Sequence, residues 1–570
     1  MSGFQPHFYF AKKVPNVSVF TPKLFTTLKS YTKELFIKDL TAGVIVAIIA
    51  LPLSIALGIA SGVTPEQGLF TAIIAGFLIS MLGGSRVQIG GPTGAFMVIV
   101  YGIVMEFGMN GLITATLMAG VMMMAMGFFR LGSIIKFIPY PITTGFTTGI
   151  AVTIFTSQIK DFLGLQLEHN PAEFLEKVSV YAEHIDTVNW GSVLIGALSL
   201  AILIFWPKVS RKVPGSLIAL IVATVVVQVT GMDVATIGST FGELSSKIPT
   251  PRIPTVSLSE MRMLIGPAFT IAILGSIESL LSAVVADGII GSKHRSNMEL
   301  VAQGVANIAS GLFGGIPATG AIARTVANIK NGGSTPVAGM VHAVVLLLIM
   351  LLFMPLAKMI PLAALAAILI IVAYNMSDWR EFVEYFHAPK SDLLVLLTTF
   401  FITVIFDLVL AIEIGMVLAA FLFMKRMSDV AEVNSVVLDS GEETDQDSES
   451  RGRAGLSFRE GLSLPKGVIA YEISGPFFFG AADKFMDNLA DLDAHAKAVL
   501  LIMTRVPAMD ATALFAFRSF KQMCNRHKVA LYIIGINEQP WSVLEKAGVI
   551  EKIGVDHFYP NLETALKQIG

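Results

Sequence analysis

Two ionisable residues stand inside apolar stretches of this 570-residue chain. Arg324 closes the segment GGIPATGAIAR, and Glu278 lies within AFTIAILGSIESLLSAVV, which holds no other charge. A charge inside a membrane span costs about 3 kcal/mol or more unless it faces protein or a water-filled cavity, so functional use is the default interpretation. We expect Arg324 to attract an anion. We expect Glu278 to exchange a proton as an anion binds and leaves nearby, because burial favours its neutral acid and a nearby cation favours its carboxylate.

The segment before Arg324 repeats a pattern found about two hundred residues earlier, where the chain reads GGPTGAF. A helix that begins at a proline points its unpaired N–H groups and its positive dipole end outward, which favours anions. We therefore predict helices that begin at Pro92 and Pro317, with their N-terminal ends facing each other across an anion site. In this arrangement Arg324 lies seven residues, roughly 10 Å, beyond its helix start, with Gly320 on the same face.

Each of these features also has a purely structural explanation. Glycine and proline are common in membrane helices and allow close packing. Arg324 could snorkel to the cytosolic surface or form a permanent ion pair with Glu278. Ser282 and Thr93 bring hydroxyl groups to the region, but serine also packs helices. His342 is alone in an apolar run, where we expect a satisfied core residue.

The composition places these residues in a membrane protein. Apolar residues make up 54% of the chain and charged residues 14%, far from the averages of soluble domains. The runs that start near residues 89 and 318 are too short to cross a bilayer, so we predict half-helices there. Fourteen apolar runs occur, near residues 40–60, 68–82, 89–104, 111–129, 139–158, 190–206, 214–230, 264–286, 301–313, 318–328, 336–355, 361–374, 393–410 and 412–424.

Charge sets the expected orientation of these segments. Basic residues concentrate in one set of loops, which includes Arg130, Lys208, Lys293 and Arg380, and this bias predicts that both termini are cytosolic. The basic region 1–38 leads directly into the first apolar run without a cleavable signal. We expect a multi-pass protein of the bacterial inner membrane, in which the acidic stretch 168–186 is an amphipathic external loop.

The domains follow from the same pattern. We predict a cytosolic N-terminal region (1–38), a transmembrane domain (39–427), an acidic linker (428–465) and a small α/β domain (466–570) in which strand and helix patterns alternate. The single cysteine, Cys524, lies in this last domain and suggests a reducing compartment.

Several functions are not expected from the sequence. Its basic residues form no patch for nucleic acid. It has no metal-ligand spacing, phosphate-binding loop or nucleophile constellation, so we expect no metal, no cofactor and no enzymatic activity.

Four stretches carry a family resemblance: DLTAGVIVAIIALPLSIALGIASG, the two glycine-proline segments, and GSKHRSNMELVAQGVANIASGLFGG. They resemble the SulP sulfate-permease family of anion transporters over nearly the whole chain, and most of all its bacterial C4-dicarboxylate (DauA-like) branch, with bicarbonate transporters next. The resemblance implies an α-helical membrane protein with two inverted seven-segment repeats, a core and a gate domain, half-helices and a C-terminal STAS domain. It also implies a homodimer.

The resemblance also implies particular site residues. Substrate contacts fall on the third, tenth and first segments, here Thr93, Gly94, Ala95, Ala318, Thr319, Gly320, Ala321, Leu53, Ser54 and Leu57, together with Arg324. Glu278, with Ser282, occupies the cation-coupling position, where sodium-coupled relatives carry aspartate. Ala511 stands where regulatory STAS proteins have a phosphorylatable serine.

From these features we predict a secondary active transporter that carries a small anion with protons by an elevator-type movement. A C4-dicarboxylate such as succinate or fumarate is the predicted substrate, and sodium-coupled bicarbonate symport and sulfate transport are the alternatives. Two further alternatives are a channel and a membrane-anchored protein that signals through its STAS domain to a cytosolic partner.

Overall fold

The computed structural model describes residues 20–133, 138–167, 170–210, 213–406, 408–436, 464–465, 467–489 and 496–569. Most of the predicted N-terminal region, and residues 437–463 of the predicted linker, lie outside this range, as does Glu168 of the predicted external loop. The chain divides into two compact units, Met1–Val417 and Leu418–Gly570.

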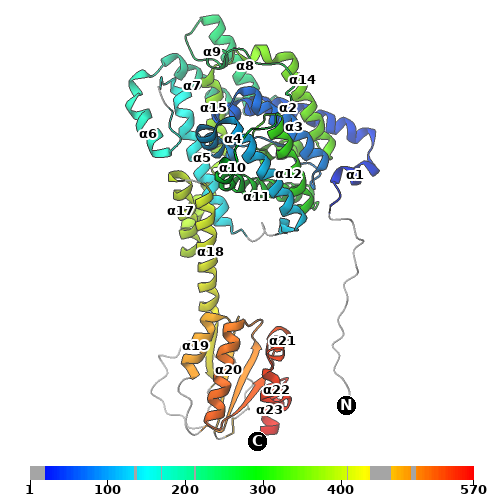
Figure 1. Ribbon diagram of the computed structural model, residues 1–570, viewed down its shortest axis with the longest axis vertical. Coiled ribbons are helices and arrows are strands. Elements are labelled where there is room, and N and C mark those ends of the chain that lie inside the picture. The colour runs from blue at the N-terminus through cyan, green and yellow to red at the C-terminus, as the bar shows by residue number, and fades with distance from the viewer. Residues whose placement is uncertain are drawn as a thin grey trace. The chain divides into compact units, whose positions relative to one another are not determined.

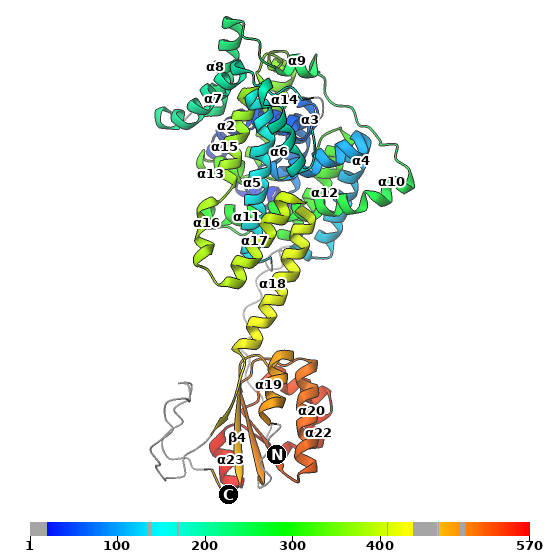
Figure 2. The same ribbon diagram turned by 90° about the vertical axis from the view of Figure 1, so that its left-hand side faces the viewer.

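Helices make up nearly all of the first unit (Figures 1 and 2). Their bounds are α1 (Lys23–Thr27), α2 (Lys33–Ala60), α3 (Pro65–Leu82), α4 (Gly94–Phe128), α5 (Tyr140–Leu163), α6 (Phe174–Glu183), α7 (Trp190–Val209), α8 (Gly215–Thr230), α9 (Ile237–Phe241), α10 (Leu258–Met263), α11 (Ile265–Ile290), α12 (Ser296–Leu312), α13 (Ile322–Lys330), α14 (Pro336–Ala357), α15 (Leu362–Met376), α16 (Trp379–Glu384) and α17 (Lys390–Ile405), and α18 (Leu408–Val430) crosses the unit boundary. Short 3-10 turns follow α1, α6 and α16, at Leu28–Ser30, Ile185–Thr187 and Tyr385–His387.

Each predicted apolar run overlaps at least one of these helices. The runs that start near residues 89 and 318 begin in extended segments before α4 and α13, and the run 393–410 reaches from α17 into α18. Within the described residues, seven helices are long and apolar enough to cross a membrane by length and composition: α2, α3, α4, α7, α11, α14 and the helix that begins at Leu362. α4 contains a kink at Gly108, whose φ of 64° favours glycine, and therefore accounts for two of the runs.

Packing contacts divide the membrane helices into two groups. We call α2, α3, α4, α11, α12, α13 and α14 the core group, because they pack mainly against one another. α5, α7, α8, α15 and α17 likewise form the gate group, and α2 touches α15 where the groups meet. Figure 1 shows α3 and α14 on one side of this unit and α5 and α7 on the other.

Two short strands meet inside the core group. β1 (Gly90–Gly91) pairs antiparallel with β2 (Thr319–Gly320), so the two glycine-proline segments lie against each other. The predicted helix starts were wrong by a few residues: α4 begins at Gly94 rather than Pro92, and α13 begins at Ile322 rather than Pro317.

Side chains from other helices explain why the segment before α13 is extended. The Asn307 side chain accepts from the Ala318 N–H (2.8 Å) and donates to the Ala318 carbonyl (2.9 Å). The Thr71 hydroxyl accepts from the Ile316 N–H at 2.7 Å. Since these groups satisfy the backbone of the segment, it need not form helical hydrogen bonds.

Asp39 fastens α2 to the start of α14. Its Oδ1 accepts from the backbone N–H groups of Ser334 and Thr335 at 2.8 and 3.2 Å, and its Oδ2 accepts from the Tyr31 hydroxyl at 3.1 Å. Partial burial and the neighbouring Asp39 carboxylate raise the pKa of Tyr31 to about 12, so this hydroxyl stays protonated at neutral pH.

The second unit contains a five-stranded sheet in the order β3-β4-β5-β6-β7. Its strands are β3 (Glu432–Val436), β4 (Val468–Ser474), β5 (Ala498–Arg505), β6 (Ala530–Ile534) and β7 (Phe558–Tyr559), and its helices are α19 (Phe479–Leu489), α20 (Ala511–Arg526), α21 (Glu538–Lys546), α22 (Val549–Ile553) and α23 (Leu562–Ile569). β4 to β7 are parallel and β3 is antiparallel to β4. Figure 2 shows α20 and α22 on one side of the sheet and α23 on the other.

The boundary of the predicted linker differs in the structure. α18 continues to Val430, and β3 lies inside the segment 428–465 that the sequence assigned to the linker. Ala431 and Val433 are buried in the core of the second unit, which explains why this stretch joins the sheet. Cys524 is buried in the same core, and burial raises the pKa of its thiol to about 11.

The close packing of α4 on α12 generates a stability prediction. A Cβ at Gly304 would lie 2.4 Å from the Gly120 carbonyl oxygen and 2.8 Å from the Met124 backbone nitrogen, so Gly304→Ala must force the helices apart. We expect a loss of about 1–3 kcal/mol, seen as a lower unfolding temperature in detergent. Gly102→Ala on α4 is the matched control, because a Cβ there meets nothing within 4 Å. Equal unfolding temperatures for the two variants would contradict this packing.

Candidate functional site

Arg324 lies in the first turn of α13 and is only 2% exposed. Its Nη2 donates to the Pro92 carbonyl at 2.5 Å, whereas Nε and Nη1 have no hydrogen-bond partner in the described part of the chain. A Cβ at Gly91 would lie 2.4 Å from Nη1, so only glycine leaves room for the guanidinium. Buried donors without partners cost free energy, which indicates that a ligand or water completes this site.

The carboxyl group of Glu278 reaches the same place from α11. The hydroxyl of Thr93, the N-cap of α4, donates to Glu278 Oε2 at 2.8 Å and does not cap its own helix. The Phe96 N–H donates to the Thr93 carbonyl at 3.3 Å. The first two N–H groups of α4, those of Gly94 and Ala95, have no acceptor within the helix, so they and the positive dipole end remain available to an anion. Thr93 therefore joins the carboxyl group to the start of α4.

Arg324 and Glu278 are neighbours but do not form an ion pair. Among the described residues no salt bridge of 4.0 Å or less joins them, although their charges are close enough to interact through space. The permanent ion pair considered from the sequence is thus absent from this conformation. Burial of the guanidinium also disagrees with snorkelling to a membrane surface.

The other predicted substrate residues fall on three neighbouring elements. Gly94 and Ala95 begin α4, and Ala318, Thr319, Gly320 and Ala321 form β2 and the residues beside it. Leu53, Ser54 and Leu57 follow Pro52 on α2, which packs against α13 and touches α4. The Ser54 hydroxyl is buried without a partner among the described residues.

Two details of the predicted geometry, the positions of Arg324 and Gly320, were wrong. Arg324 is the third residue of α13 rather than two turns into a helix. Gly320 belongs to β2, where a Cβ would collide with Gln88, and does not share a helical face with Arg324. The Ser282 hydroxyl donates to Thr325 Oγ1 at 3.3 Å, and no described contact joins it to Glu278.

A buried polar network that was not predicted from the sequence lies beside this site. Glu299 is fully buried on α12, and its Oε2 accepts from the N–H groups of Gly84 and Ser85 at 2.8 and 3.1 Å. Its Oε1 accepts from the Ser279 hydroxyl at 3.1 Å, and Gln88 Nε2 donates to the same hydroxyl at 2.8 Å. Glu299 follows several charged and polar residues, so its sequence context resembles a solvated loop.

His342 is buried, as expected, but it is not satisfied. Neither ring nitrogen has a hydrogen-bond partner within the described residues. The expectation of a satisfied core histidine was therefore half right, and the sequence offered no signal that its partners would be missing.

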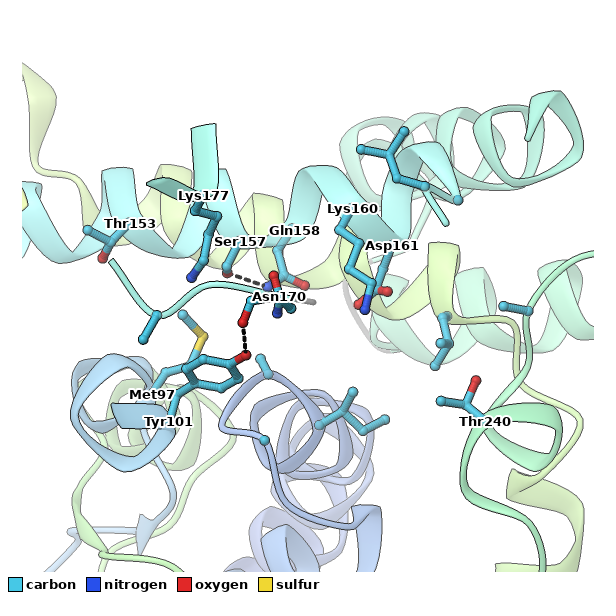
Figure 3. A pocket seen from close by; sticks show the side chains of 18 of the residues that line it. Met97, Tyr101, Thr153, Ser157, Gln158, Lys160, Asp161, Asn170, Lys177 and Thr240 are labelled. Carbon is cyan, nitrogen blue, oxygen red and sulfur yellow. Dashed lines mark hydrogen bonds between the residues drawn. The ribbon is translucent and has the colours of Figure 1, made fainter. Parts of the chain in front are cut away.

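A cavity of about 600 Å³ lies between the core and gate groups (Figure 3). Met97 and Tyr101 of α4 line one side of it, and residues of α5 and α6 line the other. None of the predicted site residues lines this cavity. Met97 is nevertheless about one helical turn beyond Thr93, so the cavity begins close to the start of α4.

The unit of apolar helices with its paired strands β1 and β2, together with the α/β unit, is the architecture of a membrane transporter with a STAS domain. The family model described as "Sulfate permease family" matches residues 36–399, and the STAS domain model matches residues 463–565. The chain belongs to the sulfate permease family.

Individual relatives agree with this assignment. The "Putative sulfate transporter YvdB" of Bacillus subtilis is 44% identical over 533 residues, which cover 93% of this chain and 97% of the relative. The bicarbonate transporter BicA of a Picosynechococcus strain is 31% identical, covering 93% of this chain and 94% of the relative.

Solved structures agree as well. The transmembrane domain of a cyanobacterial BicA matches with a TM-score of 0.60 and 31% identity, covering 68% of this chain and 98% of that one. Murine Slc26a9 matches with a TM-score of 0.86, covering 100% of this chain and 97% of that one, at 18% identity, and this likeness shows the shared fold alone.

Proposed function

We propose that this protein is a secondary transporter that moves a small anion together with protons across the bacterial inner membrane. The observation that carries the proposal is the buried guanidinium of Arg324, whose Nε and Nη1 have no partner among the described residues. It lies in the first turn of α13, and its Nη2 contacts the residue before Thr93, the N-cap of α4. One full positive charge and two helix ends thus favour an anion at one place.

The same chemistry suits several anions. A guanidinium binds carboxylates and tetrahedral oxyanions through paired N–H groups, so the site alone does not separate them. We retain a C4-dicarboxylate such as succinate or fumarate as the predicted substrate. The names of the relatives support bicarbonate and sulfate as alternatives.

Thr93 suggests how a proton could be coupled to the anion. While Glu278 is ionised, its carboxylate accepts the Thr93 hydroxyl hydrogen and opposes a second negative charge nearby. Protonation of Glu278 removes its negative charge and weakens the hydrogen bond that it accepts from the Thr93 hydroxyl. The hydroxyl can then donate to an anion at the start of α4. Anion and proton would therefore bind together. A sodium site would need several fixed oxygen atoms, and the Ser282 hydroxyl, which donates to Thr325, still has lone pairs to offer one, so sodium coupling stays the alternative.

Movement of the core group against the gate group would carry the loaded site across the membrane. The partition of the helices into two groups supports this elevator-type step, since helix ends from the core group surround Arg324. The competing function, signalling through the STAS domain, is weakened by Ala511. This residue begins α20 after the N-cap Asp510 and offers no hydroxyl for phosphorylation.

Removing the guanidinium tests the anion site. Arg324→Ala should raise the KM for anion uptake at least about tenfold, because charged hydrogen bonds of about 1.5–3 kcal/mol are lost. The measurement is uptake of labelled fumarate, bicarbonate and sulfate into liposomes that contain the purified protein. Lys330→Ala, an exposed cation at the other end of α13, serves as the control and should leave uptake unchanged. An unchanged KM in Arg324→Ala would remove this residue from the site.

Neutralising the carboxyl group tests the coupling. Glu278→Gln should abolish the stimulation of uptake by an inward proton gradient while anion binding persists, because glutamine resembles the protonated acid. Uptake is compared in sodium-free liposomes with and without the gradient. Glu106→Gln, which changes an exposed carboxylate of α4, should keep the stimulation. If wild-type uptake ignores the proton gradient but rises steeply with sodium, the protein is instead a sodium symporter.

A further inference from the structure

The cavity between the core and gate groups holds a cation that the anion site does not use. Lys177 of α6 lines this space of about 600 Å³ and lies over the ring of Tyr101, with its Nζ 5.3 Å from the ring centre. In the described part of the chain no carboxylate lies within salt-bridge distance of Lys177. An ammonium group without a counter-ion inside a concave space attracts anions.

Neutral donors lie beside this ammonium group. The backbone carbonyl of Asn170 accepts from the Tyr101 hydroxyl at 2.8 Å, and its Oδ1 accepts from the Tyr181 hydroxyl at 3.2 Å. Both oxygens of Asn170 are thus engaged, and its side-chain Nδ2 has no acceptor among the described residues. Gln158 uses one N–H of its Nε2 on the Ser157 hydroxyl at 2.8 Å and keeps a second. Figure 3 shows Lys177, Gln158 and Asn170 gathered around the same space.

Other charged residues also line the cavity. Lys160 and Asp161 are consecutive on α5 and largely offset each other, and they lie together in Figure 3, away from Lys177. Glu173, one turn before Lys177 on α6, and Asp233 have exposed side chains. Within the described residues, Lys177 is therefore the cation at this end of the cavity, beside the exposed carboxylate of Glu173.

The cavity continues towards the Arg324 site along α4. Tyr101 and Met97 are one turn apart on this helix, and Thr93 is one turn before Met97. Successive turns advance about 5.4 Å, so Tyr101 lies about two turns from the N-cap of α4. In the orientation predicted from the basic loops, this path leads from the external face inward.

We propose that Lys177, Asn170 and Gln158 form an entry site, which holds the transported carboxylate or oxyanion before it reaches Arg324. The inference rests on the proposed function. It adds a second anion site, whose occupant is the same anion on its way to the first. Burial lowers the pKa of Lys177 to about 8, so this site loses its charge within a range in which an arginine would keep it.

Uptake kinetics test the entry site. Lys177→Met should raise the KM for external fumarate, bicarbonate or sulfate at least about fivefold with little change in the maximal rate, because the residue acts before translocation. Lys177→Arg should retain a low KM. Lys247→Met removes an exposed lysine outside the cavity lining and should leave KM unchanged. The assay uses intact cells that produce the full chain.

The pH dependence separates charge from packing. The ammonium form predominates below pH 8 and is lost above it, so the wild-type KM should rise between pH 7 and 9 towards the Lys177→Met value. Lys177→Arg should remove this part of the rise, because guanidinium stays protonated. Tyr101, Lys160, Asp161, Glu173 and Asp233 also line the cavity and are unchanged in this comparison.

Chemical labelling tests binding without transport. A membrane-impermeant amine reagent applied from outside should modify Lys177, and sulfate or fumarate should slow that modification but not the modification of Lys247. Protection of Lys177 with a raised KM in Lys177→Met supports the entry site. An unchanged KM in Lys177→Met, or the absence of protection by every anion, overturns the entry site. Uptake by the wild type would in that case still support the proposed function. If the wild type takes up none of the anions, the proposed function fails and protection alone decides the entry site.

Discussion

The burial of one guanidinium without a carboxylate partner is the constraint on which the rest of this site depends. Arg324 is 2% exposed and spends one N–H group on the Pro92 carbonyl. A guanidinium paired with a carboxylate has no N–H groups left for a ligand. A buried guanidinium with unpaired N–H groups needs an anion or water to accept their hydrogen bonds. The absence of a salt bridge to Glu278 within the described residues keeps that need in place.

The surroundings of Arg324 hold it in this demanding position. β1 and β2 pair through only two residues each, and the chain around them is fixed by the side chains of Asn307, Thr71 and Gln88. Glu299 accepts four hydrogen bonds and fastens α12 to the turn after α3 and to α11. Hydrogen-bond networks in which every buried group has a partner make the surrounding structure rigid. This rigidity keeps the N-terminal ends of α4 and α13 in place around a ligand.

The pattern of neighbouring residues in the sequence predicted much of this fold. Contacts between residues far apart in the chain explain the features that were not predicted. Apolar runs located the helices, and the isolated charges of Arg324 and Glu278 pointed to the site, because each signal is contained in adjacent residues. The start of α13 was misplaced because Asn307 and Thr71 satisfy the extended segment before it from elsewhere in the chain. Glu299 was missed because its sequence neighbours are polar, although folding buries it completely.

A structure determined with a bound, electron-rich anion such as selenate or bromofumarate tests the central claim most directly. The account predicts density at the free donors of Arg324 and the first turn of α4, next to Thr93. Density confined to other places, with water or a carboxylate from the protein on Nε and Nη1 of Arg324 at saturating anion, would contradict it.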